Sequence, residues 1–228
     1  MSVSIDPDGH TGATHWHALW ASWRRPAPEA LHDALLERYA ERHRAYHTRQ
    51  HLEECLAQLA DMQSHAERPH ELALALWFHD AIYWPRRKDN EAASAAWLTQ
   101  AAQQAQIEAE AIQRMHALVM ATVHDASPDK TDARLLVDID LAILGAEPSR
   151  FDEYERQIRR EYRWVPEPLY RAKRAEVLRR FLDRPAVYVT PWMAGRFEAR
   201  ARGNLDAALR KLEQVSSVRR MGFGQTGP

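Results

Sequence analysis

The stretch Leu72-Ala-Leu-Ala-Leu-Trp-Phe-His79-Asp80-Ala81 decides the fold and points to the chemistry. Its first seven residues are all apolar, which predicts a helix of the protein core. An imidazole and a carboxylate follow directly, in a place where polar side chains need partners. Neighbouring helix residues point about 100° apart, so both side chains reach one metal ion only if the ion lies beside the helix. Other segments must then supply further ligands.

The rest of the chain reads as helical. Apolar residues recur at helical spacing, as in Leu52, Leu56 and Leu59, whereas alternating strand patterns are nearly absent. We predict an all-α protein of nine or ten helices with proline-containing turns. The expected helices cover residues 14–24, 28–44, 48–65, 69–83, 89–105, 108–124, 131–145, 149–163, 167–183 and 194–215. The simplest organisation is a single domain over residues 1–220 with a frayed tail at 221–228.

Composition excludes several classes of function. With 228 residues, of which 45% are hydrophobic, the chain can bury a sizeable core, and a net charge of −1 gives no general attraction to nucleic acid or membranes. The single cysteine, Cys55, excludes an intramolecular disulfide and favours a reducing compartment. No stretch approaches the ~20 apolar residues of a membrane span, and the N-terminus lacks a signal-peptide pattern. We expect a cytoplasmic protein.

Two further segments carry candidate metal ligands. Upstream lies Tyr46-His47-Thr-Arg-Gln-His51, and downstream lies Leu135-Leu-Val-Asp138-Ile-Asp140. Each combines an imidazole or a carboxylate with apolar residues that suit a buried helix face. Taken alone, His51 is as well explained as an ordinary helix histidine, and Cys55 as a packed thiol. The order His, His-Asp, Asp is the hypothesis that the chain suggests.

This order resembles the signature of the HD-domain superfamily of metal-dependent phosphohydrolases. The matching residues are His51, His79, Asp80 and Asp140. The chain also resembles a bacterial group of predicted HD phosphohydrolases through Tyr46-His47-Thr-Arg-Gln-His51, Phe78-His79-Asp80, Asp89-Asn90-Glu91 and Asp138-Ile-Asp140-Leu-Ala-Ile-Leu-Gly145. The resemblance implies a helical HD domain and a divalent metal ion held by those four residues. It also implies hydrolysis of a phosphate ester or anhydride in a small metabolite, with a nucleotide favoured.

The resemblance bears on the choice between Asp138 and Asp140. In related HD triphosphohydrolases the second aspartate of this element is the ligand, which favours Asp140. Asp138 would then accept a hydrogen bond that orients a ligating histidine, or would have only a helix-capping or surface role. Two imidazoles with two carboxylates suit Mn²⁺, Fe²⁺, Co²⁺, Ni²⁺ or Zn²⁺ better than Mg²⁺. A bound ion of this kind would activate water for attack on phosphorus.

Other polar residues are candidates for catalysis. Cyclic-nucleotide phosphodiesterases carry a similar element whose first histidine is the general acid, which suggests that role for His47, although Thr48 replaces their asparagine. A histidine that is only hydrogen-bonded near the site is an equal alternative. Glu91 would reach the metal-bound water, and Asp80 would take part in catalysis as a ligand.

Substrate contacts are expected from the residues after His79-Asp80. Arg86, Lys88 and Asn90 would hold phosphate, with a solvated basic turn before a capped helix as the alternative. His124, in a second His-Asp pair at residues 124–125, is a candidate for the substrate or for a second metal.

Two other functions and one assembly remain open. Extra histidines such as His124 and His47 keep a di-iron HD oxygenase in view. A non-catalytic module that binds metal or nucleotide would use the same site without turnover. The N-terminal stripe of Trp16, Trp20 and Trp23 reads as core or as an interface, so a homodimer is also considered.

Overall fold

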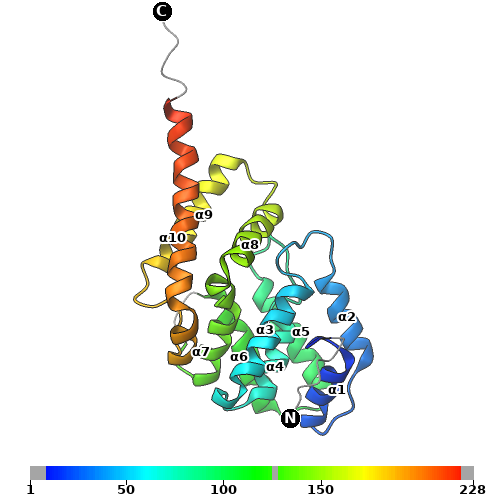
Figure 1. Ribbon diagram of the computed structural model, residues 1–228. Coiled ribbons are helices and arrows are strands. Elements are labelled where there is room, and N and C mark those ends of the chain that lie inside the picture. Colours follow the sequence, from blue (N-terminus) through cyan, green and yellow to red (C-terminus); the bar gives the residue numbers. More distant parts are fainter. Residues whose placement is uncertain (1–8, 125–127, 222–228) are drawn as a thin grey trace, which may run out of the picture. The chain divides into compact units, whose positions relative to one another are not determined.

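The computed structural model describes residues 9–124 and 128–221, with side chains up to residue 213. All regular secondary structure within these ranges is helical, which confirms the predicted all-α class (Figure 1). The chain divides into two compact units, Met1–Asp140 and Leu141–Pro228. Each unit is described by itself, and the single domain over residues 1–220 stays a prediction.

Ten α-helices occur in the described ranges, as predicted. The first unit holds α1 (Ala13–Ser22), α2 (Glu29–Tyr39), α3 (Arg49–Met62), α4 (Pro69–Phe78), α5 (Asn90–Gln104), α6 (Ala109–Met120) and α7 (Thr131–Asp140), with 3₁₀ turns at Gln63–His65 and Ala121–Val123. The second holds the 3₁₀ turn η3 (Leu141–Gly145), α8 (Pro148–Glu161), α9 (Glu167–Leu182) and α10 (Pro191–Met221). The predicted helices 28–44 and 69–83 end early, at Tyr39 and Phe78.

Helix α4, which carries the apolar stretch, is the centre of the first unit. It packs against α1, α3, α5, α6 and α7. Apart from Ala73, which is half-buried, its apolar side chains from Leu72 to Phe78 are at most 2% exposed, because neighbouring helices surround α4. A proline at the first helical position begins α4 without losing a hydrogen bond. The next two residues, His79 and Asp80, therefore lie where this buried helix ends.

The N-terminal tryptophans belong to this core. Trp16 and Trp20 are 1% and 0% exposed, and the Trp16 ring meets the Trp77 ring of α4 edge-on at 4.9 Å. The interpretation of these two residues as core is confirmed. Their indoles are used within the unit, so the homodimer stays a prediction without support from them. Among the described residues no helix is long and apolar enough to cross a membrane.

The second unit is built on α10, which packs against α9 and η3. Asn204 on α10 donates hydrogen bonds to the carbonyls of Leu144 and Ala146, each at 2.9 Å. The Tyr188 hydroxyl donates to the carbonyl of Leu141 at 3.1 Å. These contacts fix η3 against α10. Met221 ends α10, and the rest of the predicted frayed tail, 222–228, lies outside the described residues.

Candidate metal centre

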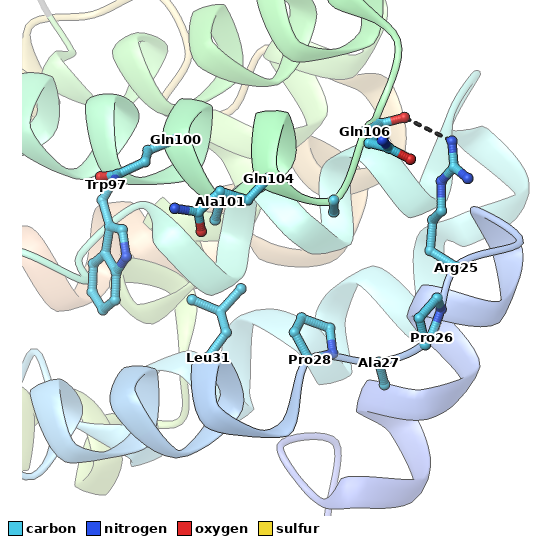
Figure 2. Close-up of a pocket in the computed structure, with 11 residues that line it drawn as sticks. Arg25, Pro26, Ala27, Pro28, Leu31, Trp97, Gln100, Ala101, Gln104 and Gln106 are labelled. Atoms are coloured by element: carbon cyan, nitrogen blue, oxygen red, sulfur yellow. Dashed lines mark hydrogen bonds between the residues drawn. The ribbon is translucent and has the colours of Figure 1, made fainter.

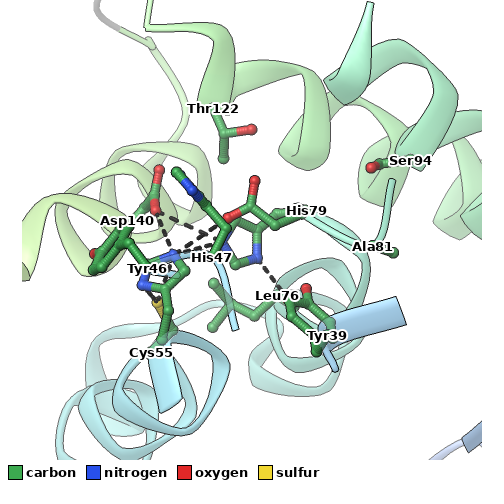
Figure 3. A network of polar contacts seen from close by, with 12 residues as sticks. Tyr39, Tyr46, His47, Cys55, Leu76, His79, Ala81, Ser94, Thr122 and Asp140 are labelled. Carbon is green, nitrogen blue, oxygen red and sulfur yellow. Dashed lines mark hydrogen bonds and ion pairs between the residues drawn. The ribbon is translucent and has the colours of Figure 1, made fainter. Parts of the chain in front are cut away.

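Four predicted ligands meet at the core of the first unit. His51 lies in the first turn of α3, His79 and Asp80 directly follow α4, and Asp140 is the last residue of α7. Because α4 packs against both α3 and α7, these helix ends converge (Figure 3). The histidine side chains are 2% and 1% exposed, whereas those of Asp80 and Asp140 are 17% and 15% exposed. The carboxylates therefore form the side of the cluster that water reaches.

The ligand atoms are close to one another. The two histidine Nε2 atoms are 3.0 Å apart. Asp80 Oδ2 lies 3.4 Å from His51 Nε2 and 3.1 Å from His79 Nε2. Asp140 Oδ1 lies 3.2 Å and 3.6 Å from the same two atoms. Five of the six pairs in this set of four atoms are thus separated by 3.0 to 3.6 Å.

These separations match the edges of a metal coordination sphere. With metal–ligand bonds of about 2.1 Å, adjacent ligands lie roughly 3.0 Å apart in an octahedron and roughly 3.4 Å apart in a tetrahedron. One ion at the centre of the cluster would therefore reach all four atoms with little movement. Two carboxylates and two neutral imidazoles carry a charge of −2, which a divalent cation would neutralise. The residues present fit a divalent metal ion.

The imidazole of His79 is oriented for coordination. Its Nδ1 donates a hydrogen bond of 2.7 Å to the carbonyl of Leu76, one helical turn earlier. With the proton on Nδ1, the lone pair of Nε2 points into the cluster. Histidines that bind metals commonly donate their second nitrogen to a carbonyl or carboxylate in this way. For His79 the acceptor is the Leu76 carbonyl, and the orienting role of Asp138 stays a prediction.

Electrostatics favours positive charge at the cluster. Burial lowers the pKa of His79, but the Asp80 carboxylate and hydrogen bonding with Asp140 outweigh it and raise the pKa well above its ordinary value. Burial raises the pKa of Asp140, but hydrogen bonds from His124, His51 and His79 hold it well below the usual range. Two Nε2 atoms at 3.0 Å leave room for only one proton between them. A metal ion would satisfy both nitrogens at once.

Cys55 is a neighbour of the cluster that the sequence hypothesis left out of the ligand set. His51, Cys55, His79 and Asp140 have ligand atoms within 4.8 Å of one another, so this group also could hold a metal ion (Figure 3). However, the thiol sulfur lies 3.7 Å from Nδ1 and 3.8 Å from Nε2 of His51. A sulfur nearly equidistant from both nitrogens lies beside the ring and not in front of the Nε2 lone pair. The Asp80 carboxylate, 3.4 Å and 3.1 Å from the two Nε2 atoms, is the other candidate for the fourth position, and its assignment as a ligand stays a prediction.

His124 and Asp138 differ in how they relate to the cluster. His124 Nε2 lies 2.9 Å from Asp140 Oδ2, the oxygen that does not face His51. Its backbone is left-handed, with φ of 59°, and its Nδ1 has no hydrogen-bond partner among the described residues. Asp125, its neighbour in the second His-Asp pair, lies outside the described residues. Asp138 is fully buried, and Asp140 is the preferred ligand of the two because its Oδ1 faces the Nε2 atoms of the two buried histidines.

His47 lies beside the cluster on a rigid support. Its ring stacks on Tyr83 with centroids 4.0 Å apart, and the His51 ring is 6.0 Å away. Burial raises the pKa of Asp80. The charges of His79 and, to a smaller extent, His47 lower that pKa and hold it well below the usual range. His47 is therefore close enough to influence the carboxylate electrostatically.

Arg44 ties the His47 segment to the His-Asp turn. Its guanidinium donates to the carbonyls of His47 at 3.0 Å, Asp80 at 2.7 Å and Ala81 at 3.0 Å. It also pairs with Glu41, and its side chain is 0% exposed. Sequence reasoning missed this residue because nothing in the local pattern distinguishes it from the many surface arginines of the chain.

Three of the residues expected to bind substrate, Arg86, Lys88 and Asn90, lie in the stretch from the His79-Asp80 pair to the first turn of α5. Arg86 and Lys88 are exposed on the loop before α5. Asn90 accepts from the backbone N–H of Trp84 at 3.0 Å and donates to its carbonyl at 3.1 Å, so its amide already stabilises the loop. Glu91 lies in the first turn of α5, and no polar contact within the described residues joins it to the cluster. The substrate and water-binding roles of these residues stay predictions.

A cavity in the first unit is a separate feature. It has a volume of 470 Å³ and lies between the segment before α2 and helix α5. Figure 2 shows Trp97 at one end and Arg25, bound to the carbonyl of Gln106, at the other. None of its lining residues belongs to the metal cluster.

Comparison of the chain with protein-family models, with curated proteins and with solved structures finds no match.

Proposed function

We propose that this protein is a metal-dependent phosphohydrolase whose ion is held by His51, His79, Asp80 and Asp140. The observation that carries the proposal is the set of ligand-atom separations of 3.0 to 3.6 Å, drawn from three segments. The resemblance to the HD-domain signature supplies the reaction type.

The donor set favours Mn²⁺, Fe²⁺, Co²⁺, Ni²⁺ or Zn²⁺ over Mg²⁺, because half of it is imidazole nitrogen. When bound, such an ion lowers the pKa of a coordinated water and polarises a phosphoryl group. Four protein ligands leave octahedral positions for both. The partly exposed carboxylates of Asp80 and Asp140 define the side from which water and substrate would enter.

Residues around the cluster would handle protons and orientation. His47, which stacks on Tyr83 and lies close enough to Asp80 to influence it, would protonate the leaving oxygen of the substrate. His124 would hold Asp140 in position through the oxygen that does not face His51. The proposed substrates are small phosphorylated metabolites, with the phosphate at the metal.

Phosphate release tests the proposal. Purified protein with Mn²⁺ is expected to release phosphate from members of a panel of nucleotides and phosphomonoesters. Asp80→Ala is expected to abolish the release while the helical circular-dichroism spectrum is retained. A suitable control is Asp61→Ala, because Asp61 lies on the exposed side of α3. Equal behaviour of wild type and Asp80→Ala across the panel would refute the hydrolase.

A two-metal oxygenase is the second candidate. It is favoured by the contact of His124 Nε2 with Asp140 Oδ2, because these two atoms could share a second ion. Metal stoichiometry and oxygen-dependent turnover separate it from the hydrolase. A binding module without turnover predicts metal binding with no product in either assay.

A further inference from the structure

Residues 80–84, which follow His79 just after the apolar helix α4, form a segment whose backbone is fixed by side chains. Arg44 binds the carbonyls of Asp80 and Ala81. The next three residues are held by Ser94 on the N–H of Ile82 at 3.0 Å, His43 on the carbonyl of Tyr83 at 2.7 Å, and Asn90 on both peptide groups of Trp84. Every residue of this fixed segment is therefore anchored, although none lies in a helix.

Two histidine rings also pack against the side chains of this segment, one on Tyr83 and one on Trp84. His47 stacks on Tyr83 at 4.0 Å, and His43 contacts the Trp84 ring at 4.1 Å. The indole of Trp84 is nevertheless 48% exposed. The exposed half of this side chain contributes no burial to the fold and is open to a ligand. A fixed backbone that presents an exposed indole lowers the cost of binding a flat ligand, because the ring is already ordered before the ligand arrives.

The fixed segment joins this indole to the metal cluster. Asp80 begins it and Trp84 ends it, so their Cα atoms lie at most ~14 Å apart. Arg86 and Lys88 follow on the exposed part of the same loop. A ligand with phosphate at one end and a flat aromatic group at the other could contact both the cluster and the indole.

We infer that Trp84 is a stacking surface for the aromatic base of the substrate, which makes the substrate a nucleotide or a related base-bearing phosphate. This inference rests on the proposed function, because the metal cluster supplies the phosphate end. Stacking on an exposed indole tolerates any base, so the surface selects base-bearing over base-free phosphates and does not discriminate among bases.

Equilibrium binding tests the inference independently of turnover. Calorimetric titrations of Mn²⁺-loaded protein would compare AMP, GMP, CMP and UMP with ribose 5-phosphate. Loss of one stacking contact corresponds to a roughly 5- to 150-fold weaker affinity. We expect Trp84→Ala to weaken nucleotide binding by that factor and Trp84→Phe to largely preserve it, while both leave ribose 5-phosphate binding unchanged. Trp164→Ala is the matched control, because Trp164 is also 48% exposed but belongs to the second unit.

Each outcome is decisive for the base-stacking role. Wild type that binds nucleotides no better than ribose 5-phosphate overturns it, as does a Trp84→Ala variant with unchanged nucleotide affinity. Equal weakening of nucleotide and ribose 5-phosphate binding also overturns it, since that marks a general structural defect. Base-dependent binding without phosphate release would refute the hydrolase but not the stacking surface. Phosphate release with no preference for a base would support the hydrolase and refute the stacking surface.

Discussion

Arg44→Lys removes the guanidinium that joins the His47 segment to the His79-Asp80 turn. The guanidinium contacts three backbone carbonyls, on His47, Asp80 and Ala81, and one carboxylate, on Glu41. Its donors point in fixed, divergent directions, whereas a lysine ammonium is a single point on a flexible chain. A lysine can therefore reach the carbonyl of His47 or the carbonyls of Asp80 and Ala81, but not both segments at once.

The structure sets the size of the expected effect. A buried acceptor left without a donor costs about 1–3 kcal/mol. With one or two of the carbonyls abandoned, the free energy of unfolding should fall by roughly 2–4 kcal/mol. For a chain of this size, that corresponds to a melting temperature lower by roughly 10 °C. The fixed segment should loosen at the same time, so metal affinity should fall as well.

Thermal and urea unfolding of metal-free protein, in the presence of a chelator, would measure the stability term without a contribution from metal binding. Arg42→Lys is the matched control, because Arg42 is exposed and lies two residues away. It should change the free energy of unfolding by less than ~0.5 kcal/mol. An Arg44→Lys variant as stable as this control would refute the assigned role of Arg44.

Two further predictions concern stability away from the cluster. Burial raises the pKa of Glu53, but hydrogen bonds from the backbone of His10 and Thr11 lower it below its ordinary value of 4.5. Wild type should therefore be more stable than Glu53→Gln at pH 7, and urea titrations should show the difference vanishing as pH falls through the lowered pKa. Gly145→Ala would place a Cβ atom 2.7 Å from that of Phe197, which should destabilise the protein by about 1–3 kcal/mol. Gly203→Ala, with nothing within 4 Å, should instead stabilise α10 by up to ~1 kcal/mol, and thermal melts that rank the two variants the other way would contradict this packing.

The fold was largely predictable because helical periodicity is a local property. The all-apolar stretch of α4 predicts a core helix, and the structure buries that stretch almost completely. The end of α4 at Phe78, against a predicted end at 83, was not predictable. Residues 80–84 are held by Arg44, Ser94 and Asn90, which come from other parts of the chain.

The candidate site was predictable in part. The order His, His-Asp, Asp led to atoms that lie together in the structure, since each sits at a helix end directed at the core. Cys55 could have been included, because it is four residues after His51 and so shares its helix face. The contact of His124 with Asp140 depends on a left-handed backbone, for which the sequence carries no local signal at a histidine.

Metal content and affinity of the purified protein test the central claim most directly. Elemental analysis and competition titrations should find about one tightly bound first-row divalent ion per chain, because the cluster forms a single coordination sphere. We predict that His79→Ala and Asp80→Ala lose this ion, whereas Cys55→Ala keeps it with nearly unchanged affinity. A wild-type protein that binds no such ion, or an Asp80→Ala variant that binds it as tightly as wild type, would contradict the account.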